Sequence, residues 1–118
     1  MGDFRKLEVW KKSRRLVGLV YRLTTPLPID ERYGLRAQIR GAAISIMANI
    51  AEGCGRNRDR ELARFLEIAL GSAAELESHF VVAMDQRFLA AESAAEVILE
   101  TRDIRRMLVG LRRKLQSR

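Results

Sequence analysis

Residue types that support catalysis and cross-linking are scarce in this 118-residue sequence. Cys54 is the only cysteine, so no disulfide can form within the chain and nothing indicates an oxidising compartment. It also has no neighbouring histidine that could act as its base. The only histidine, His79, follows Glu75 by four residues, whereas a di-metal bundle site needs Glu-x-x-His motifs on two helices. We therefore expect no catalytic residues, no metal site and no cofactor, and we predict that the protein is not an enzyme.

Strand signals and helix breakers are also scarce. No alternating run of Val, Thr and Tyr is bounded by turn residues, which argues against a sheet. There are only two prolines, Pro26 and Pro28, and six of the eight glycines precede residue 60. The longest uncharged run, residues 41–51, is far shorter than the ~20 residues that span a bilayer. The first residues contain no apolar signal core. We expect a helical, soluble, cytosolic protein without a membrane partner.

Apolar residues recur with helical spacing in four segments that short joints connect. The expected helices cover about residues 7–24, 32–53, 58–88 and 94–116. The last segment has the clearest seam, because its apolar positions alternate by four and three from Val97 to Leu115. Four helices of comparable length with short joints predict an all-α fold, an up-down-up-down antiparallel four-helix bundle. We expect residues 1–118 to form this single domain.

Local signals predict where these helices begin and end. We expect Asp3 to cap the first helix, Asp30-Glu31 the second and Asn57 the third. The sequence Ser93-Ala94-Ala95-Glu96 reads as a capping box for the fourth. Gly53 is well suited to the left-handed conformation that ends many helices, so we expect it to end the second.

The segment from Ala42 to Gly53 has helical spacing but is apolar on nearly every side. Such a helix must be covered on all sides, and we expect the other helices to cover it. Asn49 lies within its apolar stripe, where an amide without hydrogen bonds would be destabilising. We expect Asn49 to bond Ser45, Glu75 or Glu77 and to fix the register of the helix; contact with a ligand is the alternative.

The net charge of +7 is unevenly distributed along the chain. Residues 1–24 carry seven Lys/Arg against two acids, and residues 99–118 also carry seven against two. Residues 67–96 carry six acids against Arg87 alone. Because the first and fourth helices are neighbours in such a bundle, we expect their basic faces to form one positive side suited to phosphates.

Thirteen basic residues are candidates for contacts with nucleic acid. They are Lys11, Lys12, Arg14 and Arg15 on the first helix, Arg56, Arg58, Arg60 and Arg64 around the joint between the second and third helices, and Arg102, Arg105, Arg106, Arg112 and Arg113 on the fourth helix. Two alternatives remain open: a solvated basic face partly paired with acids such as Glu8, Glu100 and Asp103, or subunit contacts with the acidic third helix of a neighbouring copy. No base-reading motif is present, so contacts would be mainly to phosphate.

Several motifs resemble those of a known family. The most specific are Asn49-Ile50-Ala51-Glu52-Gly53 and the pair Gly71-Ser72 with Glu75-Leu76-Glu77; others are Asp3-Phe4-Arg5-Lys6-Leu7, Val9-Trp10, Glu31-Arg32-Tyr33-Gly34-Leu35 and Arg64-Phe65-Leu66. Over nearly its whole length the chain resembles the bacterial four helix bundle protein family, known as proteins encoded in intervening sequences of large-subunit ribosomal RNA genes. The accessory variability protein of diversity-generating retroelements is a relative. Met47 stands where the family usually has proline, so a kink there should be weaker.

The resemblance implies a homo-oligomer, with a ring of five bundles, and RNA or reverse-transcriptase partners. It implies no enzymatic activity, and we interpret Asn49, Glu52 and Gly53 as structural. Independently, the first two helices carry more apolar surface than one core can use, which predicts self-association. The predicted function is a non-enzymatic, self-assembling bundle that binds RNA or DNA with little sequence specificity. The alternative is an oligomeric scaffold or adaptor that docks a protein such as a polymerase.

Overall fold

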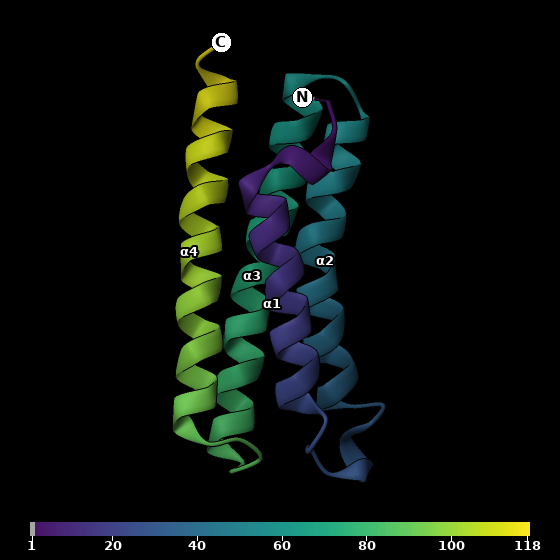
Figure 1. Ribbon diagram of the computed structural model, residues 1–118, viewed down its shortest axis with the longest axis vertical. Helices are drawn as coiled ribbons and strands as arrows, with labels where there is room; N and C mark the ends of the chain where they lie inside the picture. Colours follow the sequence, from purple (N-terminus) through teal and green to yellow (C-terminus); the bar gives the residue numbers. More distant parts are fainter. Residues whose placement is uncertain (1) are drawn as a thin grey trace.

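The computed structural model describes residues 2–118, which form four long helices and two short 3-10 turns without any strand (Figure 1). The long helices are α1 (Glu8–Thr24), α2 (Leu35–Gly55), α3 (Asp59–Asp85) and α4 (Ala91–Gln116), and the turns are η1 (Phe4–Lys6) and η2 (Ile29–Glu31). Consecutive helices run in opposite directions, and α1 also packs against α4. The fold is therefore the predicted all-α, up-down-up-down antiparallel four-helix bundle, measuring 46 × 22 × 20 Å.

The core lies along the bundle axis and receives side chains from every long helix. Its fully buried large residues include Val20, Ile39, Ile46, Ile50, Leu66, Leu76, Phe80, Ile104 and Leu108. The seam predicted on the last helix is buried except for the half-buried Leu111, and its single polar member, Thr101, donates a hydrogen bond to the carbonyl of Val97 at 2.7 Å. That bond to the residue four positions earlier satisfies a hydroxyl that would otherwise be unpaired in the core.

The predicted helix ranges agree with the structure to within three residues, and the differences have local causes. α2 begins at Leu35 rather than near residue 32, because Ile29–Glu31 form η2 first. The Glu31 carboxylate accepts a hydrogen bond from the Leu35 amide at 3.1 Å, so it serves as a cap from four residues away. α4 begins at Ala91, which places Ser93 inside the first turn, and the predicted capping box does not form.

The prediction that Gly53 ends the second helix is wrong. α2 continues to Gly55, and Asn57, which we expected to cap α3, instead takes the left-handed conformation with φ of 56°. Gly53 is buried against α3: a Cβ atom there would lie 2.8 Å from Leu62 Cδ1 and 2.9 Å from Phe65 Cβ. Its role is the close approach of α2 to α3.

α3 ends at Asp85, three residues earlier than predicted, because the chain turns through Arg87 with φ of 61°. The Phe88 amide donates to the Ala83 carbonyl and the Arg87 amide to the Met84 carbonyl, both at 2.9 Å. This pair of bonds is a Schellman motif with a non-glycine residue at its left-handed position.

The expectation that other helices cover α2 on all sides is also wrong. α2 packs against α1, α3 and the two 3-10 turns but not against α4, and its outer side is open. Gly41, Ile44 and Ala48 are exposed on this side, with Ser45 and Met47 half-buried. The helix runs unbroken through Met47. An uncharged strip therefore follows the outer side of α2 over residues 41–51, parallel to the long axis of the bundle.

Asn49 takes one of its three expected partners. Its amide donates to the Ser45 carbonyl at 2.8 Å and to the Ser45 hydroxyl at 3.0 Å. That hydroxyl lies 2.8 Å from the hydroxyl of Ser72 on α3. Glu75 and Glu77 are engaged elsewhere, with His79 and with α4 respectively. The amide of Asn49 thus belongs to a polar chain that joins α2 to α3.

Candidate nucleic-acid interface

Positive charge gathers at one end of the bundle. We call this the basic end and define it as residues 2–11, 50–67 and 107–118, that is, the start of α1, the α2–α3 joint and the end of α4, which the antiparallel topology brings together (Figure 1). It carries eleven Lys/Arg against six Asp/Glu. The opposite end, defined as the distal end (residues 19–41 and 79–99), carries five of each. Most of the net charge of +7 therefore lies at the basic end.

Acids interrupt the predicted positive side formed by α1 and α4, although the two helices are neighbours as expected. Glu100 and Asp103 on α4 face α1, and Lys12 Nζ lies 3.4 Å and 3.7 Å from their carboxylate oxygens. Asp103 also binds Arg106. Acids therefore lie between the two basic faces and pair with Lys12 and Arg106, as the first alternative expected.

Three other α4 arginines turn toward α3. Arg105 donates to Glu77 at 3.1 Å, and Arg102 lies 3.8 Å from the same carboxylate. Arg112 approaches Glu67 at 3.9 Å. These three arginines connect α4 to the acidic side of α3, so their first role is packing between neighbouring helices within one subunit.

Two arginines at the α2–α3 joint are held in fixed positions. The guanidinium carbons of Arg56 and Arg64 lie 5.4 Å and 4.5 Å from the ring centre of the buried Phe65, which is favourable cation–π geometry. Arg56 binds Glu52 at 3.0 Å and Arg64 binds Glu61 at 3.0 Å. The hydrogen bond from Arg64 lowers the pKa of Glu61, which favours its ionised form. Both guanidiniums are thus oriented before any ligand arrives.

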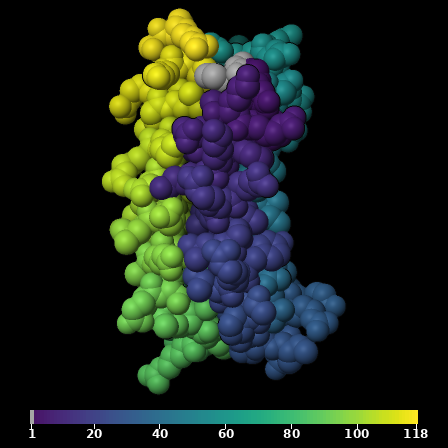
Figure 2. Space-filling view, in the orientation of Figure 1, coloured from purple at the N-terminus to yellow at the C-terminus, as the bar shows by residue number. Residues whose placement is uncertain are grey.

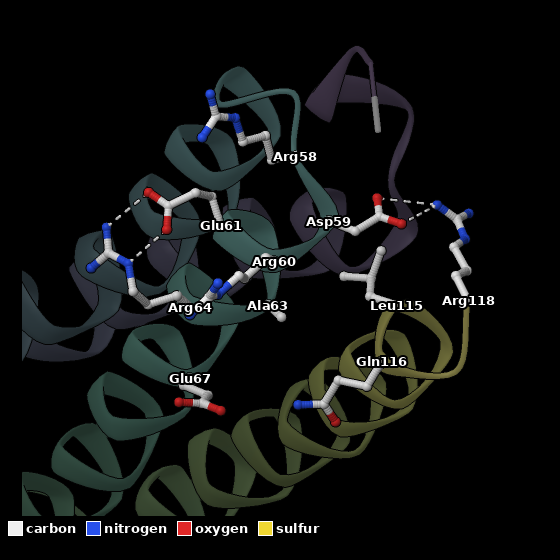
Figure 3. A pocket seen from close by; sticks show the side chains of 10 residues that line it. All are labelled: Arg58, Asp59, Arg60, Glu61, Ala63, Arg64, Glu67, Leu115, Gln116 and Arg118. Carbon is white, nitrogen blue, oxygen red and sulfur yellow. Dashed lines mark hydrogen bonds and ion pairs between the residues drawn. The ribbon is translucent and has the colours of Figure 1, made fainter.

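A groove of about 800 Å³ lies between the first turns of α3 and the last turn of α4 (Figure 3). Arg58 and Arg60 line it; both are exposed, and neither forms an ion pair within residues 2–118. Asp59 sits between them in sequence and accepts two hydrogen bonds from Arg118, at 3.0 Å and 3.2 Å. Glu61 and Glu67 also line the groove, which is therefore mixed in charge.

The structure brings only part of the predicted set together. Arg56, Arg58, Arg60, Arg64, Arg112, Arg113 and Lys11 lie at the basic end, whereas Lys12, Arg14, Arg15, Arg102, Arg105 and Arg106 lie along the middle of the bundle. Arg5, Lys6, Lys114 and Arg118 also belong to the basic end and were not among the predicted candidates. Figure 2 shows why: the start of α1 lies beside the last turns of α4 at the same end of the molecule. The segment totals included these cations, but only the antiparallel topology, followed to each end of the bundle, shows that they lie together.

Other reactive groups are enclosed or isolated. The thiol of Cys54 is 2% exposed, and burial raises its pKa. His79 lies 3.1 Å from Glu75 on the same helix. Across residues 2–118 no three side chains of His, Cys, Asp or Glu are grouped closely enough to hold a metal ion. None of the helices described has the length and hydropathy that crossing a bilayer requires.

Taken together, fold and charge define a class: a small all-α bundle with one strongly basic end and one neutral end. The chain belongs to the family of 23S rRNA-intervening sequence proteins, whose family model matches residues 5–110, and this confirms the resemblance seen in the motifs. A crystal structure from Bacteroides thetaiotaomicron, described as a protein of unknown function from the S23 ribosomal protein family, is similar with a TM-score of 0.74. The match covers 87% of this chain and 96% of that chain at 23% identity, which supports the fold alone. No curated protein matches the chain.

Proposed function

We propose that this protein is a non-enzymatic, self-assembling helical bundle that binds RNA or DNA through phosphate contacts at its basic end. The observation that carries the proposal is the polarised charge, eleven Lys/Arg against six acids at one end and a balanced count at the other. Arg58 and Arg60 are exposed there without ion pairs, so binding a phosphate would not require them to release a carboxylate.

Phosphate contacts suit this surface physically. Each contact releases condensed counterions, so such binding is strong at low salt and weakens steeply as salt rises. Arg56 and Arg64 are already oriented over Phe65, which reduces the side-chain entropy that binding would otherwise cost. Phosphate contacts carry no direct sequence information, so we expect little sequence preference.

The test is fluorescence anisotropy of labelled RNA between ~50 and ~200 mM salt, the range in which phosphate binding weakens most visibly. The variant removes two unpaired cations of the basic end, Arg58→Ala with Arg60→Ala. The matched control removes two exposed cations of the distal end, Arg22→Ala with Arg32→Ala, which changes net charge equally. We expect the first variant alone to bind more weakly, with a log–log salt slope shallower by about 2.

Two results would contradict the proposal. No retention of RNA by the unsubstituted protein at ~50 mM salt would remove it, because electrostatic binding is strongest there. Equal weakening in both variants would show that net charge matters and the basic end does not. The scaffold alternative predicts the first result in purified protein, together with nuclease-resistant capture of a protein partner.

A second observation favours self-assembly through α2. Between Arg40 and Glu52 the helix carries no charge, and Ile44 is 40% exposed on its outer side. Exposed apolar surface of this kind marks interfaces. We propose that copies of the chain meet along this strip, and the family resemblance implies a ring of five.

Light scattering tests the assembly. We expect a mass that is a multiple of 13.5 kDa, falling to 13.5 kDa in Ala48→Glu, because a carboxylate buried at the contact is strongly unfavourable. Ala95→Glu places the same change on an exposed position of α4 and serves as control. A single-chain mass at micromolar concentration in the unsubstituted protein would refute self-assembly.

A further inference from the structure

The aromatic rings of the basic end are all covered by neighbouring side chains. These are Phe4, Trp10 and Phe65, and every aromatic residue of the sequence lies within the described residues 2–118. Trp10 is 9% exposed and Phe65 is 6% exposed. Phe4 packs on Trp10 with ring centres 4.9 Å apart. Arginines already lie over all three rings, so none offers a face to a nucleic-acid base.

The exposed aromatic residues lie at the distal end. Tyr33 is 85% exposed in the α1–α2 connection, and Tyr21 is 38% exposed with the guanidinium of Arg40 at 4.3 Å over its ring. Charge is balanced at this end. Proteins that bind single strands combine a positive track with aromatic platforms on which bases stack. Here the two features are separated along a molecule 46 Å long.

The groove at the basic end is also unsuited to a single strand. A strand drawn into it would approach three carboxylates, those of Asp59, Glu61 and Glu67 (Figure 3). Of the four arginines that line the groove, Arg64 and Arg118 are already paired with Glu61 and Asp59. The unpaired cations of the basic end are not confined to this groove: besides Arg58 and Arg60, which line it, they are Lys6 in η1 and Arg113 and Lys114 near the end of α4. They are spread over an end about 20 Å across.

A double helix matches such a spread. A B-form DNA duplex presents two rows of phosphates, with one charge per ~1.7 Å of axis, on either side of a major groove ~12 Å wide. An RNA duplex presents its two rows on either side of a wide, shallow minor groove. Cations distributed over about 20 Å can therefore reach phosphates on both sides of a groove without touching a base. We propose that the basic end binds double-stranded nucleic acid in preference to single strands, an inference that rests on the nucleic-acid binding proposed above.

The experiment compares a 20-base-pair RNA duplex with an unstructured 40-nucleotide RNA, so that the two probes carry nearly the same number of phosphates. Both are titrated with the assembled protein by anisotropy at ~100 mM salt, where electrostatic binding is still strong. We expect the duplex to bind at least tenfold more tightly. Equal or tighter binding of the single strand would overturn the duplex preference while leaving nucleic-acid binding intact. Failure of both probes to bind would overturn the function itself.

Two variants separate charge from stacking. Arg58→Ala with Arg60→Ala should weaken duplex binding, whereas Tyr33→Ala should leave the binding of both probes unchanged. Tyr33 is so exposed that its replacement has no packing consequence for the core. Selective loss of single-strand binding in Tyr33→Ala would place a stacking site at the distal end and contradict the inference.

Discussion

Replacing Gly53 with alanine tests whether α2 and α3 approach as closely as the structure shows. The added Cβ would lie 2.8 Å from Leu62 Cδ1, 2.9 Å from Phe65 Cβ and 3.3 Å from Leu62 Cα. The Leu62 methyl can rotate away, but the other two atoms lie at or next to the α3 backbone. Because carbon atoms pack best at ~3.5 Å or more, the two helices would have to separate by about half an ångström.

The expected magnitude is a difference of two effects. Overpacking a well-filled contact costs about 1–3 kcal/mol, while alanine in place of a helical glycine gains about 1 kcal/mol. Gly53→Ala should therefore lower the free energy of unfolding by roughly 0–2 kcal/mol. Gly110→Ala is the matched control, since it lies within α4 and a Cβ there meets nothing within 4 Å. We expect it to raise stability by about 0.5–1 kcal/mol.

The measurement is urea unfolding followed by far-ultraviolet circular dichroism at one fixed protein concentration. The two variants should differ by about 1–3 kcal/mol, seen as a shift of the midpoint at constant slope. If Gly53→Ala were as stable as Gly110→Ala, the close contact at Gly53 would be refuted. The interpretation of this glycine as a packing residue would then fail with it.

Two further predictions concern buried groups. Burial raises the pKa of the Cys54 thiol above its ordinary value of 9.0, so the unfolded chain releases the thiol proton at lower pH than the folded chain. The free energy of unfolding should therefore fall as pH rises through 9. Cys54→Ala should remove this contribution to the pH dependence, which urea unfolding at several pH values measures. The hydroxyls of Ser45 and Ser72 lie 2.8 Å apart, and a double-mutant cycle with alanine at both positions should give a coupling of about 0.5–1.5 kcal/mol, whereas no coupling would mean that they do not bond.

The helices and their topology could be predicted because apolar periodicity dominates each segment. On α4 the buried residues from Val97 to Leu115 follow the seam that the sequence displays. The apolar spacing predicts the buried face correctly because burying that face stabilises the helix more than the secondary-structure propensity of any single residue. Helix ends are less predictable, since several neighbouring residues can accept the same conformation.

Gly53 and Asn57 illustrate the point about helix ends. Both residues tolerate left-handed geometry, and the sequence alone favoured the glycine. Only the position of Leu62 and Phe65 on α3 reveals that Gly53 is required for close packing. Because Gly53 stays within α2, the left-handed residue that reverses the chain direction comes later, at Asn57.

The distribution of charge could be predicted only in part. The basic character of the first and last segments was visible, but their acids Glu100 and Asp103 occupy the side of α4 that faces Lys12. One residue of shift around a helix turns a side chain by about 100°, so segment totals do not reveal which face is positive. The ends of the segments were the better guide, because an antiparallel bundle brings them together regardless of rotation.

A last prediction connects the uncharged strip on α2 with the basic end. The strip runs along the long axis of the bundle, so copies that meet along it in a ring about a parallel axis would point all their basic ends the same way. Several basic ends on one face could then engage one long duplex, and avidity would strengthen binding by ~10²-fold or more.

Ala48→Glu, which we expect to separate the copies, should weaken binding to a 60-base-pair duplex by that factor. It should change binding to a 12-base-pair duplex by no more than about threefold, since one copy suffices there. If copies instead met in opposite directions, their basic ends would lie on opposite faces of the assembly. Ala48→Glu would then produce single chains without the selective loss on the long duplex, and the parallel arrangement would be refuted.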